Sequence, residues 1–415
     1  MRALYTLLLY LITPLVLLRL LWKSRLQPEY RQRIAERFGR VPAAPDGVAV
    51  WVHAVSVGES LAALPLIEAL IRTHGEGRVW VTTTTPTGSA RVSAALGARV
   101  RHSYAPYDLP GAVARFLERA RPRQVVIMET ELWPNLFRAI RRAGLPLFVA
   151  NARLSPRSFR GYGRLRRSIA GVLADCTEVA AQSEADAQRF RELGAPRVSV
   201  MGNIKFDLSV PEPQLRLGHD WRDRLGQERP VWIAASTHEG EEQAALAAHR
   251  VLLESLPEAA LILVPRHPQR FADVAGLLDK SGLRWLRRSQ RNPDRQTQVL
   301  FGDSMGEMLA YFAAADLAFV GGSLVPVGGH NVLEPAALGL PVLFGPHMHN
   351  FVAARDLLLQ HDAAQAVDAA GLALVLRDLF GNPGRRNTMG AAGKAAVEAN
   401  RGALEKLLRL LGVPA

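Results

Sequence analysis

Cysteine is nearly absent from this chain, since Cys176 is the only one in 415 residues. A single cysteine excludes an internal disulfide framework and fits a reducing compartment. Low-complexity tracts and internal repeats are also lacking, which argues against a disordered chain or a solenoid. With 48% apolar residues over this length, the composition predicts two globular domains of about 200 residues each.

Two common site motifs are missing as well. No GxGxxG follows the first predicted strand, so a dinucleotide-binding pyrophosphate turn is poorly supported. The segment HEGEE, which begins at His238, lacks the second histidine of a zinc-binding HExxH, and we expect no metal there. Other loops must therefore carry the chemistry.

Acidic residues are outnumbered. The chain has 38 Asp and Glu against 51 Lys and Arg, a formal charge of +13. An excess of positive charge fits a protein that binds nucleic acid, acidic lipid or a phosphorylated substrate. The positions of the basic residues along the chain must distinguish these three partners. Seven basic residues lie between Arg19 and Arg40, directly after the uncharged apolar segment 3–18.

This apolar segment, extended to Trp22, approaches the roughly 20 residues that span a bilayer. A signal peptide is the alternative, but no small-residue cleavage site follows, and the positive cluster lies on the C-terminal side. We predict an uncleaved anchor over residues 1–22, with the rest on the cytoplasmic side, where cationic flanks stay. Pro14 and the short length leave open a helix that lies in the membrane interface.

After the anchor, β-rich segments alternate with helical patterns, which is typical of α/β proteins with doubly wound parallel sheets. The predicted strands are 48–53, 78–83, 124–129, 146–151, 178–182 and 198–202, then 230–236, 261–265, 298–302, 316–322 and 341–345. We expect two Rossmann-like domains facing a cleft, 23–206 and 215–415, joined by a proline-containing linker at 207–214. Ligands of such folds bind at the carboxyl ends of the strands.

Carboxylates follow two strands of the first domain. Glu59 comes one residue after a glycine, at or near the start of a helix that runs from Leu61. It either complements the positive helix N-terminus or serves as a general base with a tuned pKa. Glu129 and Glu131 are two residues apart, so an extended chain would point both the same way and shift their pKa values. A helix cap before Pro134 explains only one of them.

The segment between Arg153 and Arg167 has six arginines and no acid. A solvated basic face is the ordinary interpretation of such a run. With a membrane anchor in the same chain, contact with lipid phosphate is the alternative, and its candidates are Arg153, Arg157, Arg160 and Arg164. No stacking or groove-reading motif accompanies these charges, so we do not expect nucleic acid as a partner.

The second domain has richer loops. Ser236 and Glu239 have the spacing of a capping box, and Arg266 directly follows a predicted strand. The segment 318–335, AFVGGSLVPVGGHNVLEP, is the strongest local signal, because paired glycines allow close approach of the backbone. His330 and Asn331 would present a helix N-terminus to an anion, and Glu334 could accept from sugar hydroxyls.

Nine motifs in this order carry a resemblance to a known family: HAVSVGE, TPTGS, METELWPN, NARLS, KFD, STHEGEE, PRHP, GDSMGE and GGHNVLEP. Together they closely resemble the bacterial 3-deoxy-D-manno-octulosonic acid (Kdo) transferases, lipid A-specific glycosyltransferases of the GT-B class. The resemblance covers essentially the whole chain, including the anchor. Several motifs are specific to this family, whereas the Gly-rich and Glu-Pro region is shared more loosely among GT-B enzymes.

The resemblance implies a reaction at the cytoplasmic face of the bacterial inner membrane. Kdo passes from CMP-Kdo to the 6-hydroxyl of the distal glucosamine of lipid IVA, a lipid A precursor, with inversion at the anomeric carbon. Members add one or more Kdo residues. Another membrane-associated GT-B transferase with a different sugar nucleotide is the alternative, and a non-catalytic lipid-binding scaffold is a third possibility.

The resemblance also assigns roles to residues. Glu59 matches the general base of the family, and Glu129 and Lys205 match its transition-state positions. No cofactor or metal is implied beyond the donor substrate. The implied nucleotide contacts are Pro265, Arg266, Met305, Gly306, Glu307, Asn331, Val332, Leu333 and Glu334.

Overall fold

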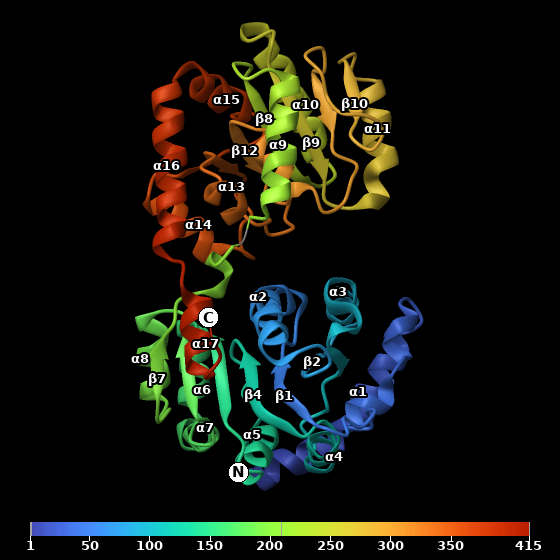
Figure 1. The fold of residues 1–415 in the computed structure, drawn as a ribbon, viewed down its shortest axis with the longest axis vertical. Coiled ribbons are helices and arrows are strands. Elements are labelled where there is room, and N and C mark those ends of the chain that lie inside the picture. Colours follow the sequence, from blue (N-terminus) through green and yellow to red (C-terminus); the bar gives the residue numbers. More distant parts are fainter. Residues whose placement is uncertain (1, 209, 415) are drawn as a thin grey trace. The chain divides into compact units, whose positions relative to one another are not determined.

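The computed structural model describes residues 2–208 and 210–414. The chain divides into two compact units: unit 1 comprises Met1–Asp207 and Arg401–Ala415, and unit 2 comprises Leu208–Asn400 (Figure 1). Each unit is an α/β structure around one seven-stranded sheet, and all neighbouring strands pair in parallel.

The sheet of unit 1 has the strand order β3-β2-β1-β4-β5-β6-β7. Its inner strands are apolar on both faces, as expected for strands covered by helices on each side, and all six residues of β1 are buried. The strands are β1 (Val48–His53), β2 (Val79–Thr83), β3 (Arg101–Tyr104), β4 (Pro122–Met128), β5 (Leu147–Ala152), β6 (Glu178–Ala181) and β7 (Val198–Val200).

Helices cover both faces of this sheet. One buried cluster joins α2, α3 and α17 to the first face, and another joins α4, α5, α7 and α8 to the second. The helices are α1 (Arg2–Lys23), α2 (Val57–His74), α3 (Pro86–Leu96), α4 (Pro110–Ala120), α5 (Pro134–Arg142), α6 (Pro156–Gly163), α7 (Arg166–Leu173), α8 (Glu184–Glu192) and α17 (Ala403–Leu410).

The sheet of unit 2 has the order β10-β11-β9-β8-β12-β13-β14. Its strands are β8 (Val231–Thr237), β9 (Ala260–Pro265), β10 (Trp285–Arg287), β11 (Val299–Phe301), β12 (Leu317–Val320), β13 (Val342–Phe344) and β14 (Ala364–Ala366). Helices α10, α11, α15 and α16 pack on one face and α9 and α12 on the other. The unit 2 helices are α9 (Glu212–Leu225), α10 (Glu241–Ser255), α11 (Phe271–Asp279), α12 (Met308–Ala313), α13 (Leu333–Ala337), α14 (Val352–Gln360), α15 (Leu372–Gly381) and α16 (Pro383–Ala399).

Each sheet has a point at which the strand order reverses. It lies between β1 and β4 in unit 1 and between β8 and β12 in unit 2. The connections that leave the two strands there go to opposite faces of the sheet, so a crevice opens at their carboxyl ends, where ligands of such folds bind. Binding and catalytic residues are therefore expected in the loops that follow β1, β4, β8 and β12.

All eleven strands expected from the sequence are present, with bounds that differ by two residues or fewer. The two Rossmann-like domains are thus confirmed. Three further strands were not predicted: β3, β10 and β14. All three lie at sheet edges, where strands are short or partly polar and leave a weak alternation signal.

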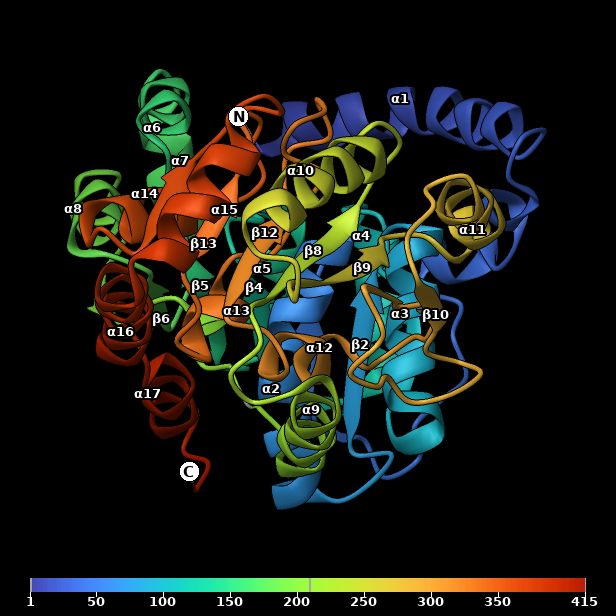
Figure 2. The ribbon, with the colours of Figure 1, turned by 90° about the horizontal axis from the view of Figure 1, so that it is seen from above.

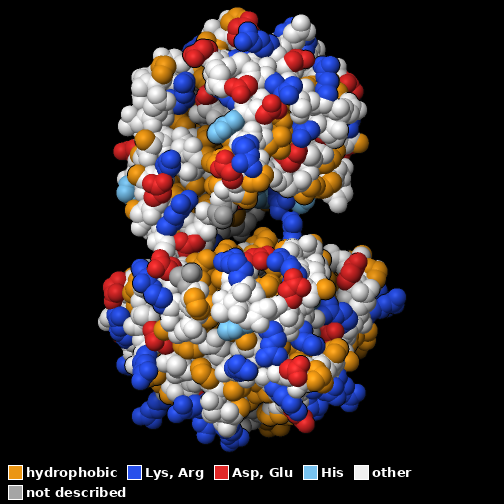
Figure 3. Space-filling view, in the orientation of Figure 1, with side chains coloured by type: hydrophobic (Ala, Val, Ile, Leu, Met, Phe, Trp, Pro, Cys, Tyr) orange, Lys and Arg blue, Asp and Glu red, His pale blue; other side chains and the backbone are white. Residues whose placement is uncertain are grey.

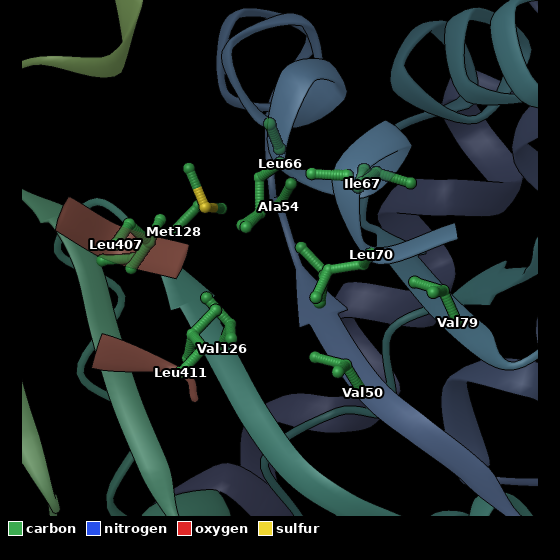
Figure 4. Close-up of a cluster of buried hydrophobic side chains, with 14 of the residues drawn as sticks. Val50, Ala54, Leu66, Ile67, Leu70, Val79, Val126, Met128, Leu407 and Leu411 are labelled. Carbon is green, nitrogen blue, oxygen red and sulfur yellow. The ribbon is translucent and has the colours of Figure 1, made fainter. Parts of the chain in front are cut away.

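The predicted domain bounds need two corrections. The expected linker at 207–214 is partly helical, because α9 begins at Glu212. The second domain does not run from 215 to 415, because residues 401–415 return to unit 1. There Leu407 of α17 and Leu411, which directly follows this helix, pack into the cluster that contains Val126 and Met128 of β4 (Figure 4). The C-terminal residues therefore belong to the unit in which their apolar side chains are buried, although they follow the other unit in the sequence.

Asp207, predicted as the start of the linker, helps to fix this return. Its carboxylate accepts hydrogen bonds from the backbone N–H groups of Gly402 at 2.6 Å and Leu404 at 2.5 Å. It thus caps the N-terminus of α17, where four N–H groups otherwise lack partners.

We expect Leu407→Ala to destabilise unit 1 by about 2–5 kcal/mol, because Leu407 is fully buried and its truncation leaves a cavity. Chemical denaturation, followed by hydrogen exchange within β1 and β4, measures this loss. Arg409→Ala on the exposed side of α17 is the matched control and should cost under about 0.5 kcal/mol. A loss confined to unit 2 would contradict the assignment of α17.

Candidate active site and nucleotide site

Glu59 lies in the first turn of α2, directly after the carboxyl end of β1. Ser56 caps this helix, and its Oγ accepts from the N–H of Glu59 at 3.2 Å. In return the Glu59 carboxylate accepts from the Ser56 hydroxyl at 2.9 Å and from the N–H of Val55 at 2.7 Å. The helix therefore begins at Val57 rather than at Leu61 as expected, and the cap fixes the direction of the Glu59 side chain.

The environment of Glu59 suits a proton acceptor. Only 7% of the residue is exposed. Burial raises the pKa of Glu59 to about 7, with smaller contributions from the charges of Glu129 and Glu131, although the hydrogen bonds from Val55 and Ser56 oppose this rise. A carboxylate with a pKa near neutrality can exchange a proton at physiological pH. The interpretation of Glu59 as part of a helix cap is confirmed, while its role as a general base stays a prediction with which the raised pKa agrees.

Glu129 and Glu131 follow β4, the neighbour of β1 at the reversal point. The prediction that an extended chain points them the same way is wrong, because Glu129 has a left-handed backbone with φ of 57°. Glu129 pairs with Lys205, whereas Glu131 accepts from the indole N–H of Trp133 at 2.8 Å. Neither residue caps α5, because the carboxylate of Asp108 accepts from the N–H groups of Asn135 and Leu136 in its first turn. Burial also raises the pKa of Glu131.

The structure brings Lys205 to the same place from a distant part of the sequence. Its Nζ lies 3.7 Å from Oε1 of Glu129. Lys205 belongs to a short 3₁₀ helix, Ile204–Phe206, whose first N–H donates to Oδ1 of Asn151 at 3.1 Å. Glu59, Glu129 and Lys205 thus lie in one region of unit 1.

Asn151 is a residue to which sequence reasoning gave no role. It is fully buried at the end of β5, with φ of 55°. Non-glycine residues with a left-handed backbone carry conformational strain, and such residues cluster at functional sites. Its place in the NARLS motif was the available signal. Asn151 positions the segment that carries Lys205.

The basic run from Arg153 to Arg167 forms α6 and α7. Phe159 and Tyr162 pack against the core of unit 1, while all six arginines of the run are exposed. Tyr162 lies within electrostatic range of Glu131, so this basic surface adjoins the loop after β4. Figure 3 shows further Lys and Arg side chains along the outer edge of unit 1.

The N-terminal segment is one helix of 22 residues, α1, in which an 18-residue stretch has a mean hydropathy of 2.0, and the helix is long and apolar enough to cross a membrane. Most of its large apolar side chains are exposed, including Leu11, Leu15 and Trp22. This helix is consistent with the predicted membrane anchor.

In unit 2, the predicted nucleotide residues follow three strands that lie near one another in the sheet. Pro265 ends β9 and Arg266 follows it. Met305, Gly306 and Glu307 follow β11, and residues 331–334 come after β12. All are therefore at the carboxyl edge, beside the reversal point at β8 and β12.

Several of these side chains are already held in place. Glu307 pairs with Arg288 at 2.9 Å and accepts from the hydroxyl of Ser304. Asn331 donates to Glu334 at 3.0 Å, and its Oδ1 accepts from the N–H of Leu333, the first residue of α13. Met305 is 59% exposed, so its apolar side chain is accessible at this edge.

The paired glycines after β12 allow close approach of the backbone, as expected, and the group that they approach is a carboxylate of the same unit. The N–H groups of Gly322, Ser323 and Leu324 donate to the carboxylate of Glu241, at 2.6, 2.9 and 2.8 Å. A Cβ on Gly321 would lie 2.8 Å from the same carboxylate. This loop therefore closes on a side chain of its own unit.

The capping box predicted for Ser236 and Glu239 is also wrong. Helix α10 begins at Glu241, and its cap is Gly240, whose N–H donates to the side chain of Gln243. Ser236 instead has φ of 55° within β8. Glycine adopts the backbone geometry needed at this turn, so the helix starts later than the Ser-to-Glu spacing indicated.

His330 does lie at this edge, but in a contact that the sequence did not indicate. Its Nε2 is 2.8 Å from Nε2 of His238, and the two rings stack. Burial lowers the pKa of His330 to about 3 and also lowers the pKa of His238. Among the described residues, no group of three or more His, Cys, Asp and Glu could hold a metal ion.

Comparisons with known proteins agree with this architecture. Residues 32–208 match the family described as 3-deoxy-D-manno-octulosonic-acid transferase (kdotransferase). The chain is 42% identical to 3-deoxy-D-manno-octulosonic acid transferase of Haemophilus influenzae, over 99% of this chain and 98% of the relative. It is 41% identical to the Bordetella pertussis protein with the same name, over 99% and 98%.

A solved structure of more distant sequence shows the fold alone. UDP-GlcNAc 2-epimerase from Neisseria meningitidis is 14% identical, with a TM-score of 0.57 over 88% of this chain and 99% of that one. The full-length identity to two curated relatives, together with the match of unit 1, decides the family. The chain belongs to the 3-deoxy-D-manno-octulosonic acid transferases, which are glycosyltransferases with the two-Rossmann-domain GT-B architecture.

Proposed function

We propose that this enzyme transfers Kdo from CMP-Kdo to the 6-hydroxyl of the distal glucosamine of lipid IVA, in lipopolysaccharide biosynthesis. The observation that carries the proposal is Glu59, a buried carboxylate at the reversal point of unit 1 with a pKa near 7. A sugar hydroxyl is a weak nucleophile, and a positioned base of this pKa contributes about 10²–10⁴-fold to its reaction.

In the proposed step, the oxygen of the acceptor hydroxyl attacks the anomeric carbon of Kdo. A carboxylate oxygen of Glu59 accepts the hydroxyl proton as this bond forms. The bond from that carbon to the CMP phosphate breaks on the opposite side, and the configuration inverts. Lys205, held 3.7 Å from Glu129, supplies positive charge near the base. Unit 2 supplies Arg266 for the phosphate that leaves, so the proposal requires neither metal nor cofactor.

The basic surface on α6 and α7 fits the acceptor. Lipid IVA carries two phosphates, and guanidinium groups bind phosphate with paired hydrogen bonds. Arg157 and Arg160 project from α6, with Arg153 just before it and Arg164 at its end. With α1 as the membrane contact, we place the enzyme on the cytoplasmic side of the bacterial inner membrane.

The reaction itself is tested by mass spectrometry of the product from lipid IVA. We expect a mass increase of one or more Kdo units with CMP-Kdo and no transfer from UDP-sugars. Transfer from a UDP-sugar in place of CMP-Kdo would contradict the donor, and an unmodified lipid IVA with both donors would contradict the proposal as a whole.

Glu59→Gln should lower the transfer rate at least about a hundredfold, because it removes the proton acceptor. The amide oxygen can still accept from the N–H of Val55 and the amide NH₂ can donate to Ser56, so the helix cap survives. Single-turnover kinetics measures the rate, while thermal unfolding and CMP binding serve as controls and should be unchanged. A variant that retains the wild-type rate would exclude Glu59 as the base.

The pH profile of kcat/KM should rise through an apparent pKa of about 7 and level off above it, since only the deprotonated Glu59 accepts a proton. Glu131→Gln removes one of the charges that raise the pKa of Glu59, so the midpoint should move to lower pH. An unchanged midpoint in Glu131→Gln would indicate that another group titrates.

Replacing Arg157, Arg160 and Arg164 by Glu should raise the KM for lipid IVA at least about tenfold, since each reversed charge repels the acceptor phosphates. CMP affinity should not change, and the effect should weaken at high salt. Replacing the exposed Lys280, Lys394 and Lys406 by Glu makes the same change in net charge elsewhere and should leave KM unaltered. Equal loss in both triple variants would contradict a local phosphate site.

A further inference from the structure

Unit 1 contains a cavity of about 830 Å³ between α1, α4 and α5. In Figure 2, α1 is the long helix along one edge of the picture, and its first residues line the cavity together with residues of α4 and α5. The size lies within the range of sites that bind small organic ligands, about 300–1,000 Å³. Nothing in the proposed transfer reaction uses this cavity, which we call the anchor groove.

The wall formed by α1 is fixed to the domain by polar contacts at its first turns. The hydroxyl of Tyr5 donates to Asp108 at 2.9 Å, and the hydroxyl of Thr6 donates to Asn135 at 3.0 Å. Asp108 also accepts from the N–H groups at the start of α5, at 3.1 and 2.6 Å. The groove is therefore a built feature of the fold and does not depend on loose packing of an apolar helix.

The walls of the groove are apolar on both sides. Leu7 and Tyr10 of α1 lie opposite Ala114 and Leu117 of α4, with Ala139 of α5 beside them. Leu7 and Tyr10 remain 56% and 52% exposed, so no side chain of the described protein fills the space over them. Because the rest of α1 presents leucines to its surroundings, the groove is continuous with the surface that meets the bilayer.

Positive charge accompanies these apolar walls. Arg2 of α1 and Arg138 and Arg142 of α5 line the groove, and none of its described lining residues is acidic. The Nε of Arg138 is buried and makes no hydrogen bond, and its Nη1 has only a long contact of 3.5 Å with Asp175. Burying a donor without a partner is costly, so the protein leaves the hydrogen-bonding capacity of Arg138 unfilled, and the side chain is 41% exposed, so its outer guanidinium nitrogens can meet an acceptor oxygen in the groove.

We propose that the anchor groove binds one anionic glycerophospholipid of the bilayer. An acyl chain lies along the walls of α1 and α4, and the phosphate meets Arg138 and Arg142. Apolar walls alone would take any acyl chain, whereas three guanidinium groups favour a headgroup with net negative charge.

The position of the arginines distinguishes this lipid from the acceptor. Helix α5 begins beside the catalytic loop after β4 and has nine residues, so Arg142 lies about 12 Å further along its axis, at 1.5 Å per residue. A phosphate bound there is directed away from the edge that carries Glu59 and Glu129. The acceptor phosphates have their own candidates on α6, which adjoins that edge.

Native mass spectrometry of the full chain released from vesicles tests the proposal. From vesicles that contain phosphatidylglycerol and phosphatidylcholine, we expect one retained phosphatidylglycerol per chain. Ala114→Trp, which fills the groove from an exposed position, and the double variant Arg138→Gln/Arg142→Gln should each reduce this occupancy at least tenfold.

Two matched controls separate the groove from general effects. Ala143→Trp adds the same bulk at the exposed end of α5, and Arg141→Gln/Arg123→Gln removes the same charge from exposed positions outside the lining; both should retain the lipid. Thermal unfolding confirms that each variant is folded.

Equal retention of phosphatidylcholine, or a lipid adduct that persists in Ala114→Trp, would overturn the proposal. So would displacement of phosphatidylglycerol by lipid IVA in a one-to-one ratio, because the groove would then belong to the acceptor. Kdo transfer is measured separately in the same variants, so failure here leaves the proposed reaction untouched.

Discussion

The reversal of strand order is the constraint on which both candidate sites depend. Parallel pairing requires each strand to be followed by a crossover, and successive crossovers pack the chain on one face until the order reverses. At β1 and β4, and again at β8 and β12, the departing connections separate to opposite faces. Side chains at these strand ends therefore lie outside the packed layers that bury the strands. They can be polar without disrupting the core.

Two buried glutamates show how hydrogen-bond donors decide what a carboxylate does at such a place. Glu241 accepts from four backbone N–H groups, including that of His238, which uses the acceptor capacity of both oxygens. It braces a loop. Glu59 accepts from only two donors, so its oxygens keep lone pairs for a proton. The same residue type, with similar burial, is structural in unit 2 and is the proton acceptor of the proposed mechanism in unit 1.

The sequence indicated what depends on local pattern. Strands buried on both faces were visible as apolar runs, and the loops after them pointed to Glu59, Glu129 and the edge around Arg266. It did not indicate what depends on backbone geometry or on distant pairing. The left-handed turn at Glu129 redirects its side chain, Glu241 occupies the glycine loop, and His330 meets His238 across 92 residues of sequence. None of these leaves a periodic signal.

The return of α17 to unit 1 affects how the chain is made. Residues 208–400 form an insertion within the domain that surrounds them in sequence. Synthesis proceeds from the N-terminus, so β4 emerges long before Leu407 and Leu411, which cover Val126 and Met128. Unit 1 is thus the first domain to leave the ribosome and the last to complete its core. Part of the apolar face of its sheet stays exposed while unit 2 folds. Exposed apolar surface of this kind is bound by chaperones and promotes aggregation. A chain that ends before residue 403 would contain all of unit 2 and an incomplete core of unit 1.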